Sequence, residues 1–220
     1  MIVRVLVGFL IIVLLLGISL FMIPVDSFLK RVAGSSMLTY SLAEGNLFKG
    51  RINDISYRRS IDLAPLNIGD YNYEGSPLLT GLKIAFNENE GSTAGVVKIN
   101  LFNGSYYIED FTAEAPYVTN GLGVLDVKVH IEQMAIKDGM CDSIEGKLSL
   151  SNDSFDETVS GNLRCLEDSV YKVKLLDSKN NEKGLMIYRP GFIDLEIETN
   201  ILKSDVSVFL GNRMGFTIPL

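Results

Sequence analysis

The sequence predicts a mainly β fold, in which an N-terminal transmembrane helix is followed by an antiparallel, curled β-sheet that runs as a meander. Three observations lead to this prediction: a long uncharged apolar run near the N-terminus, alternating apolar and polar residues through most of the remaining chain, and turn-forming residues between the alternating stretches. The 220 residues are 47% hydrophobic and 21% charged. Such a chain has enough apolar surface to fold, which excludes the disordered class.

The apolar run extends from Val5 to Ile23 and contains no charged residue. At 1.5 Å per residue, a helix of this length spans about 28 Å, close to the roughly 30 Å hydrocarbon core of a bilayer. A cleaved signal peptide is the alternative, but its apolar region is usually about 7–15 residues long and a small-residue cleavage site follows it. No Ala-x-Ala sequence follows this run. We therefore expect a retained membrane anchor between Val5 and Ile23.

The charges are distributed unevenly around this run. The chain has 20 Lys and Arg against 27 Asp and Glu, a net charge of −7, and every acidic residue follows the run. A nucleic-acid-binding protein usually carries a basic patch; no basic run here exceeds two residues, so we expect no nucleic-acid partner. We expect the large acidic part to face outward, into a bacterial periplasm or an equivalent oxidising space. The expected location is therefore the bacterial inner membrane, crossed once, with the C-terminal part in the periplasm.

These features divide the chain into three parts: a membrane anchor (1–24), a juxtamembrane linker that includes a short amphipathic stretch (25–42) and a periplasmic β-domain (43–220). Within the β-domain, apolar and polar residues alternate with the period of two that places successive side chains on opposite faces of a strand. Each such stretch has one apolar and one polar face, as in antiparallel strands with one solvated side. The predicted strands are 82–86, 97–101, 125–131, 147–151, 171–175, 193–198 and 206–210.

Turn-forming sequences separate these strands, and two of them are Asn-Gly pairs. Asn-Gly favours a tight hairpin, because both central residues of a type I′ turn need positive φ. The spacing favours an antiparallel meander over units of alternating strand and helix. An open sheet of this kind exposes edges that can accept another strand, and an apolar face that its own curl, a partner or lipid must cover. The predicted turns are 87–91, 103–104, 120–121, 152–153 and 177–181.

The two cysteines, Cys141 and Cys165, lie 24 positions apart and do not form a Cys-x-x-Cys redox or zinc pattern. Two buried free thiols are one interpretation. A disulfide is the other, and we favour it because an exported chain meets an oxidising compartment. The polar segment 151–157 lies between strand-like runs, so a hairpin there would bring the two cysteines together. The closed loop would then stabilise the fold by about 3–4 kcal/mol in the chain-entropy model.

The order of short glycine-containing segments resembles the protein N component of bacterial type II secretion systems and, more loosely, the AsmA-like β-rich membrane-tethered proteins. The resemblance covers nearly the whole chain. It implies a bitopic inner-membrane protein with a periplasmic β-domain that serves secretion as an accessory and is not an enzyme. The segments that carry it are AEGNLFKGRINDISY (43–57), PLNIGDYNYEGSPLLTGLKIAF (65–86), GMCDSIEGKLSL (139–150), VSGNLRC (159–165) and RPGFIDLEIE (189–198).

Few residues are suited to catalysis. His130 is the only histidine, so any serine or cysteine triad would have to use it. It alternates onto the polar face of its strand with Asp126 and Lys128, and we interpret it as a solvated strand residue. The segment from Gly45 to Gly50 lacks the Lys-Ser/Thr ending and the following helix of a phosphate-binding loop, so we predict a turn there. We expect no catalytic site and no cofactor.

Three carboxylates, Asp194, Glu196 and Glu198, line one face of a predicted strand. Like charges at this spacing could bind a hard cation, but a solvated face is the commoner outcome and is our expectation, so we expect no metal site. The segments 103–105 and 152–154 match the N-glycosylation sequon, and in a bacterial chain we interpret both as turns.

Two functions remain. The first is an accessory subunit of a type II secretion system, whose sheet edges or apolar rim bind other secretion subunits by strand addition. The alternative is a lipid-handling bridge, in which a curled sheet with an apolar interior passes acyl chains. The expected partners are inner-membrane lipids and other secretion subunits, with transported lipid as a further candidate. Binding energy at an interface concentrates in a few large side chains, and the candidate interaction residues are Phe48, Tyr106 and Tyr107.

Overall fold

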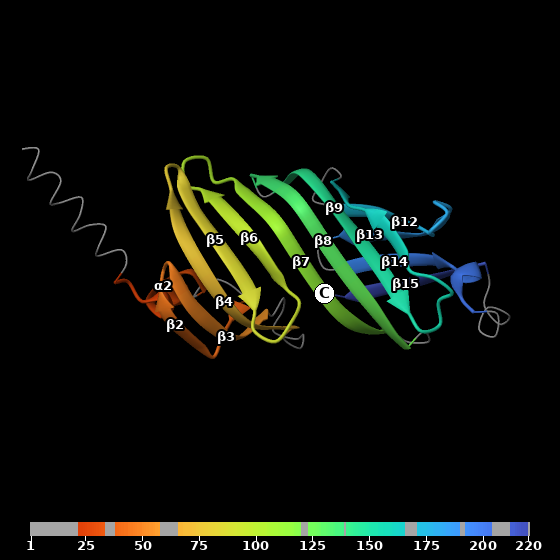
Figure 1. Cartoon of the computed structure of the whole chain (residues 1–220), viewed down its shortest axis with the longest axis horizontal. Coiled ribbons are helices and arrows are strands. Elements are labelled where there is room, and N and C mark those ends of the chain that lie inside the picture. The colour runs from red at the N-terminus through yellow and green to blue at the C-terminus, as the bar shows by residue number, and fades with distance from the viewer. Residues whose placement is uncertain are drawn as a thin grey trace, which may run out of the picture. The chain divides into compact units, whose positions relative to one another are not determined.

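The computed structural model describes residues 22–33, 38–57, 66–119, 123–138, 140–165, 171–189, 192–203 and 212–219, and we restrict the description to them. The chain divides into two compact units. The first unit comprises the chain up to Pro77 together with Ile84–Glu90, and the second comprises Leu78–Lys83 together with the chain from Gly91 onward. Each unit is described by itself below, and Figure 1 labels most of the elements of both.

Most of the described residues are in strands, which confirms the predicted mainly β class. The strands pair antiparallel in one sheet that does not close on itself, in the order β1-β3-β4-β5-β6-β7-β8-β9-β10-β12-β13-β14-β15, with β2 beside β3 and β11 beside β12. The bounds are β1 Leu38–Thr39, β2 Leu42–Asn46, β3 Lys49–Tyr57, β4 Leu66–Leu78, β5 Gly81–Glu88, β6 Ala94–Asn100, β7 Tyr106–Thr119, β8 Gly123–Lys137, β9 Met140–Asn152, β10 Val159–Asn162, β11 Arg164–Cys165, β12 Tyr171–Leu176, β13 Glu182–Arg189, β14 Phe192–Glu198 and β15 Arg213–Pro219.

The first unit begins with helix α2 (Val25–Ala33), which contacts β2. Val25 is buried, whereas Asp26 and Lys30 form an exposed ion pair one turn apart, with Nζ 2.6 Å from Oδ2. The strands of this unit place Tyr71 and Tyr73 of β4 in its interior, both nearly buried. Tyr71 contacts Phe86 of β5 edge to face, with ring centroids 6.0 Å apart.

The hairpin between β2 and β3 depends on two glycines that face each other in the ladder, Gly45 and Gly50. Gly45 has φ of +101°, a conformation that favours glycine. The turn is held by Asn46, whose Oδ1 accepts hydrogen bonds from the N–H groups of Phe48 and Lys49 at 2.8 and 2.9 Å. The segment from Gly45 to Gly50 is therefore a tight hairpin turn, as predicted.

The second unit folds its part of the sheet so that the apolar faces of two sets of strands meet. Strands β8 and β9 contribute Leu125, Leu148 and Leu150, while β12 and β14 contribute Val173, Leu175, Leu195 and Ile197 to one buried cluster. In Figure 1 the later strands, drawn in blue, pass behind the green β7 and β8. Phe155, Ile201 and Leu202 come from the connections between strands and complete the cluster; Phe155 and Leu202 are joined by a bridge. The predicted curl of the sheet thus appears within this unit.

Six of the seven predicted strands lie within β5, β6, β8, β9, β12 and β14, although Leu101 falls in the turn after β6. The seventh, 206–210, lies outside the described residues. The predicted turns at 87–91, 103–104, 152–153 and 177–181 lie in or beside breaks between strands, and 120–121 lies outside the described residues. Strands β4, β7, β13 and β15 were not among the predicted strands.

The N-terminal predictions fall mostly outside the described residues. No helix in the described part of the chain is both long enough and apolar enough to cross a bilayer. Of the predicted anchor, only Met22 and Ile23 are described, and they precede α2 in a turn. The anchor therefore stays a prediction. The segment 25–42, expected as a linker, holds α2 and β1, so regular structure begins earlier than residue 43.

Candidate functional site

The two cysteines are brought together as predicted. Cys141 and Cys165 have Cα atoms 5.7 Å apart and sulfur atoms at bonding distance, within the spacing that a disulfide needs. The hairpin of β9 and β10 continues past Leu163, whose N–H donates to the carbonyl of Gly146 at 2.9 Å. This continuation returns β11 to the first residues of β9. The disulfide therefore fastens β11 to the start of β9.

The three candidate interaction residues do not form one surface. Phe48 is half-buried in the β2–β3 turn of the first unit. Tyr106 and Tyr107 are 44% and 37% exposed in the second unit. Being consecutive residues of β7, they point to opposite faces of the sheet: Tyr106 pairs with Ile99 and Ile136, and Tyr107 pairs with Lys98 and Ala135. At most one of the two tyrosines can contribute to any single interface on a face of this sheet.

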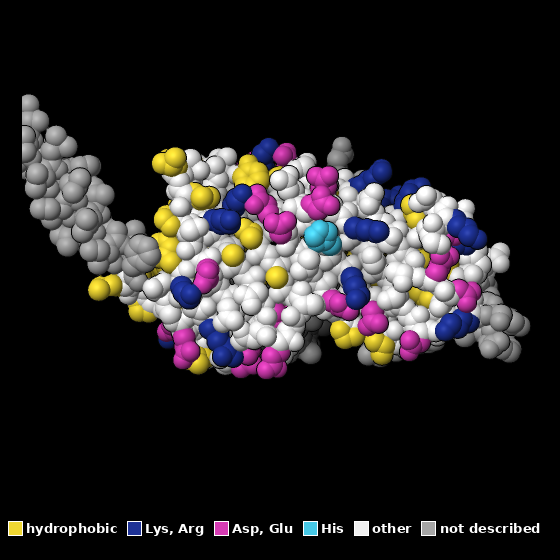
Figure 2. All heavy atoms as spheres, viewed as in Figure 1, with side chains coloured by type: hydrophobic (Ala, Val, Ile, Leu, Met, Phe, Trp, Pro, Cys, Tyr) yellow, Lys and Arg dark blue, Asp and Glu magenta, His cyan; other side chains and the backbone are white. Residues whose placement is uncertain are grey.

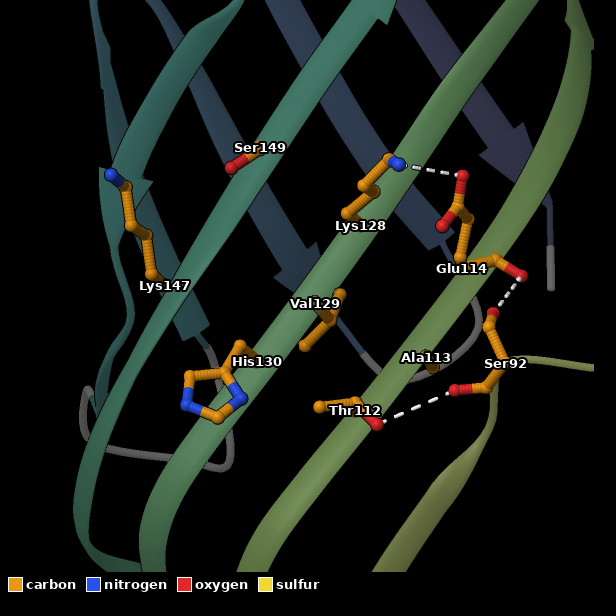
Figure 3. A pocket seen from close by; sticks show the side chains of 9 residues that line it. All are labelled: Ser92, Thr112, Ala113, Glu114, Lys128, Val129, His130, Lys147 and Ser149. Carbon is orange, nitrogen blue, oxygen red and sulfur yellow. Dashed lines mark hydrogen bonds and ion pairs between the residues drawn. The ribbon is translucent and has the colours of Figure 1, made fainter. Parts of the chain in front are cut away.

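His130 lies in a shallow depression of about 340 Å³ on the polar face of β7, β8 and β9 (Figure 3). It stands between Thr112 and Lys147, its register partners on the neighbouring strands. In the next row Lys128 stands between Glu114 and Ser149, and its Nζ lies 2.8 Å from the Glu114 carboxylate. That hydrogen bond and the carboxylate charge raise the pKa of Lys128 above its ordinary value. Most of the residues that line the depression carry a hydroxyl or a charged group, although much of its surface comes from their apolar atoms.

The geometry of this depression does not assemble a nucleophile and a base. Among the described residues, no hydrogen bond joins the His130 ring to a carboxylate or to a hydroxyl. The nearby hydroxyl of Thr112 donates instead to the backbone carbonyl of Ser92 at 3.3 Å. Figure 2 shows the single histidine (cyan) on an open face, with basic side chains (dark blue) and acidic side chains (magenta) around it. The arrangement agrees with the interpretation of His130 as a solvated strand residue.

The acidic strip of β14 is paired with arginines. Asp194 lies 3.3 Å from Arg189, and Glu196 and Glu198 lie 2.8 and 3.8 Å from Arg213. The hydrogen bond from Arg213 to Glu196 raises the pKa of the arginine further. No group of three or more metal-binding side chains occurs in the described part of the chain. The three carboxylates of the strip are therefore engaged in ion pairs with two arginines.

The two ends of the strand order differ in how their edges are covered. At the first end, α2 contacts β2, and Pro24 bridges to Asn46. At the other end of the order of described strands, β15 is terminal and pairs with β14 through residues 213–219. Met214 and Phe216 of β15 are half-buried and extend the apolar cluster to this edge. Sequence reasoning missed these two residues, although the alternation in RMGFTIP could have revealed them.

These features define the candidate functional site as a set of surfaces: the β15 edge, the polar depression around His130, and the exposed side chains of the turns. Comparison of the chain with protein-family models, curated proteins and solved structures finds no match.

Proposed function

We propose that the chain is a membrane-anchored accessory component of a bacterial type II secretion system, whose β-domain binds other secretion subunits in the periplasm. The resemblance of its glycine-containing segments to the protein N component supports this proposal. The two cysteines at disulfide distance support an oxidising compartment.

The observation that carries the proposal is the edge at β15. A terminal strand offers unpaired backbone groups to an incoming strand, and proteins usually cover or shorten such edges. β15 is seven residues long, and its half-buried Met214 and Phe216 would be covered further by one more strand. On the outer face, Arg213 and Thr217 already bond to β14 carboxylates. An added strand would therefore gain main-chain hydrogen bonds and an apolar contact together, the usual basis of strand addition.

The packing of the second unit favours this role over lipid transfer. A sheet that passes acyl chains needs an apolar groove, whereas here the facing apolar sides are filled by each other's side chains. Leu150, Leu175 and Ile197 are at most 1% exposed. Charged side chains line the depressions around His130 and around Arg213, although Leu185 and Ile187 also line the second.

The proposal is tested by in-cell photocrosslinking from β15. A photoreactive residue is placed at Thr217 and, as the matched control, at the exposed Gln133 of β8, which lies outside the depression around His130. Thr217 should crosslink to a periplasmic domain of another secretion subunit, and Gln133 should not, because it already pairs with β7 on one side and β9 on the other. Further positions at Phe48, Tyr106 and Tyr107 test the interaction residues that the sequence suggests. Deletion of the chain should reduce secretion of a reporter exoprotein.

Two results would reject the secretion role. Equal crosslinking from Thr217 and Gln133 would show that the β15 edge is not a specific interface. Crosslinks to lipid alone, with unchanged secretion and altered outer-membrane permeability, would favour the lipid-handling alternative.

A further inference from the structure

Two neighbouring hairpin turns of the second unit carry large apolar side chains in full contact with solvent. We call them the turn pair: Leu79–Thr80 between β4 and β5, and Leu101–Ser105 between β6 and β7. Leu79 is fully exposed, Phe102 is 83% exposed and Leu101 is 74% exposed. Single exposed apolar residues are ordinary on protein surfaces, but three of this size at adjacent turns call for an explanation.

The two turns are fixed beside each other. The N–H of Leu101 donates to the carbonyl of Thr80 at 2.9 Å, which joins one turn to the other. At the start of β5, Gly81 approaches β6 so closely that a β-carbon would lie 1.8 Å from the carbonyl oxygen of Ile99. This close approach holds the two hairpin ends in contact. Leu79, Leu101 and Phe102 therefore belong to one surface.

Several backbone N–H groups of the second turn find acceptors within the turn itself. Asn100 and Ser105 close it, with the Asn100 N–H donating to the Ser105 carbonyl at 2.9 Å. The Asn100 carbonyl accepts from the N–H of Gly104, and its side-chain oxygen accepts from the N–H of Phe102. The side-chain oxygen of Asn103 accepts from both the N–H and the hydroxyl of Ser105. These donors need no water, which is the condition for placing a turn in an apolar phase, where each unsatisfied group costs several kcal/mol.

The turn pair is also free of charge in an otherwise charged chain. No charged residue occurs from position 75 to 82 or from position 99 to 108, whereas the whole chain carries 47 charged side chains, as 20 basic and 27 acidic residues. The second uncharged stretch continues into Tyr106 and Tyr107. Aromatic residues beside aliphatic ones are typical of the membrane–water interface, where amphipathic rings lie at the level of the headgroups.

We propose that the turn pair inserts into the interface of a lipid bilayer. A protein partner would have to present a pocket for each projecting side chain, whereas a bilayer accepts convex apolar tips without a matching shape. The run between Val5 and Ile23 places such a bilayer within reach of the chain, and in this respect the inference rests on the anchor in the proposed function. The contact is apolar, so neither anionic lipid nor low salt is needed for it.

The absence of tryptophan from the chain gives a direct test. Full-length variants Leu79→Trp and Phe102→Trp are reconstituted in phosphatidylcholine vesicles whose acyl chains carry bromine, a contact quencher of tryptophan fluorescence. Val124→Trp is the matched control. Val124 is also exposed, at 50%. It lies in β8, twelve residues before Ile136, the register partner of Tyr106. At the rise of a strand, Val124 is therefore about 40 Å from the end of β8 beside Tyr106. Leu14→Trp reports on the anchor separately.

We expect the Leu79→Trp and Phe102→Trp variants to lose roughly half of their emission, because interfacial side chains reach about 5–10 Å into the boundary of headgroups and acyl chains. The Val124→Trp emission should not change, and added phosphatidylglycerol or salt should have no effect. An equal fractional loss of emission from Phe102→Trp and Val124→Trp would overturn the proposal. A blue-shifted but unquenched Phe102→Trp would overturn it in favour of a protein contact.

The experiment tests the membrane anchor and the contact of the turn pair with lipid separately, because each has its own tryptophan variant. Quenching of Leu14→Trp without quenching of Phe102→Trp would reject the turn contact and leave the anchor in place. Quenching of Phe102→Trp without quenching of Leu14→Trp would support the turn contact and reject the anchor.

Discussion

The hydroxyl group of Tyr73 lies over Gly50, so close that a β-carbon on this glycine would come within 2.5 Å of the hydroxyl oxygen. The same hydroxyl donates a hydrogen bond to the backbone carbonyl of Asn46 across the hairpin. Tyr73 and Gly50 are also register partners in β4 and β3. The tyrosine therefore joins three strands of the first unit, and only a residue without a side chain can lie beneath it.

Gly50→Ala should destabilise the first unit. The new methyl group would clash with the backbone carbonyl oxygen of Glu44 as well as with Tyr73. The carbonyl oxygen belongs to the backbone, so no change of side-chain rotamer can relieve this clash. Forced contacts of this kind cost about 1–3 kcal/mol. The measurement is the free energy of unfolding in denaturant, with hydrogen exchange of β3 amides to localise the loss.

Gly215→Ala is the matched control, because Gly215 is also a strand glycine but has open space where its β-carbon would lie. Glycine within a strand costs about 0.5–1 kcal/mol relative to alanine, so this variant should be neutral or slightly more stable. Equal losses from both variants would contradict the packing of Tyr73 over Gly50.

The hydroxyl of Tyr73 should ionise at a higher pH than an ordinary tyrosine. Burial raises the pKa of Tyr73 from 10.0 to about 12. Because the folded-state pKa is above the unfolded one, the contribution of this group is fully present below pH 10 and is lost as the pH rises towards 12. The check is the tyrosinate absorbance of the folded wild type minus that of Tyr73→Phe, titrated with base. A difference that develops near the ordinary pKa of tyrosine would contradict the burial of this hydroxyl.

Strand alternation predicted the parts of the fold where one face is buried. In β8 and β14 the inward residues, such as Leu125 and Ile197, are buried and the residues between them are not, so period two was visible in the sequence. β4 carries Asn and Gly at many positions and β7 carries consecutive tyrosines, which hides the same period. β13 is apolar on both faces, because Leu185 and Ile187 are half-buried on its outer side.

The candidate surfaces were less predictable. Which exposed apolar residues lie together depends on register and on the contact between turns, as the hydrogen bond from Leu101 to Thr80 shows. Leu79 and Phe102 are thereby neighbours, although the sequence separates them by a whole hairpin. The cysteines could be predicted because the hairpin that joins them is local, with its polar turn between the two strands.

Reduction of the disulfide should lower the stability of the second unit. Cys141 and Cys165 enclose a sequence separation of 24, for which the chain-entropy model gives a loss of about 3–4 kcal/mol. The measurement is unfolding in denaturant with and without reductant. The double variant Cys141→Ser, Cys165→Ser should have the same free energy of unfolding as the reduced wild type, and added reductant should not change it. An unfolding transition of the wild type that reductant does not shift, or two thiols that label without reduction, would contradict the bond.

The filled interior of the second unit leads to the last prediction, which also bears on function. Leu150 is 1% exposed in the cluster where β8 and β9 meet the later strands. Leu150→Ala should cost about 2–5 kcal/mol in the free energy of unfolding, because it removes buried methyl groups and leaves a cavity. Leu79→Ala removes the same atoms from a fully exposed position of the same unit and should change stability by no more than about 0.5 kcal/mol. If both substitutions cost equally little, the facing apolar sides are not packed against each other. The space between them would then be open to an acyl chain, and the lipid-handling role would replace the secretion role as the better proposal.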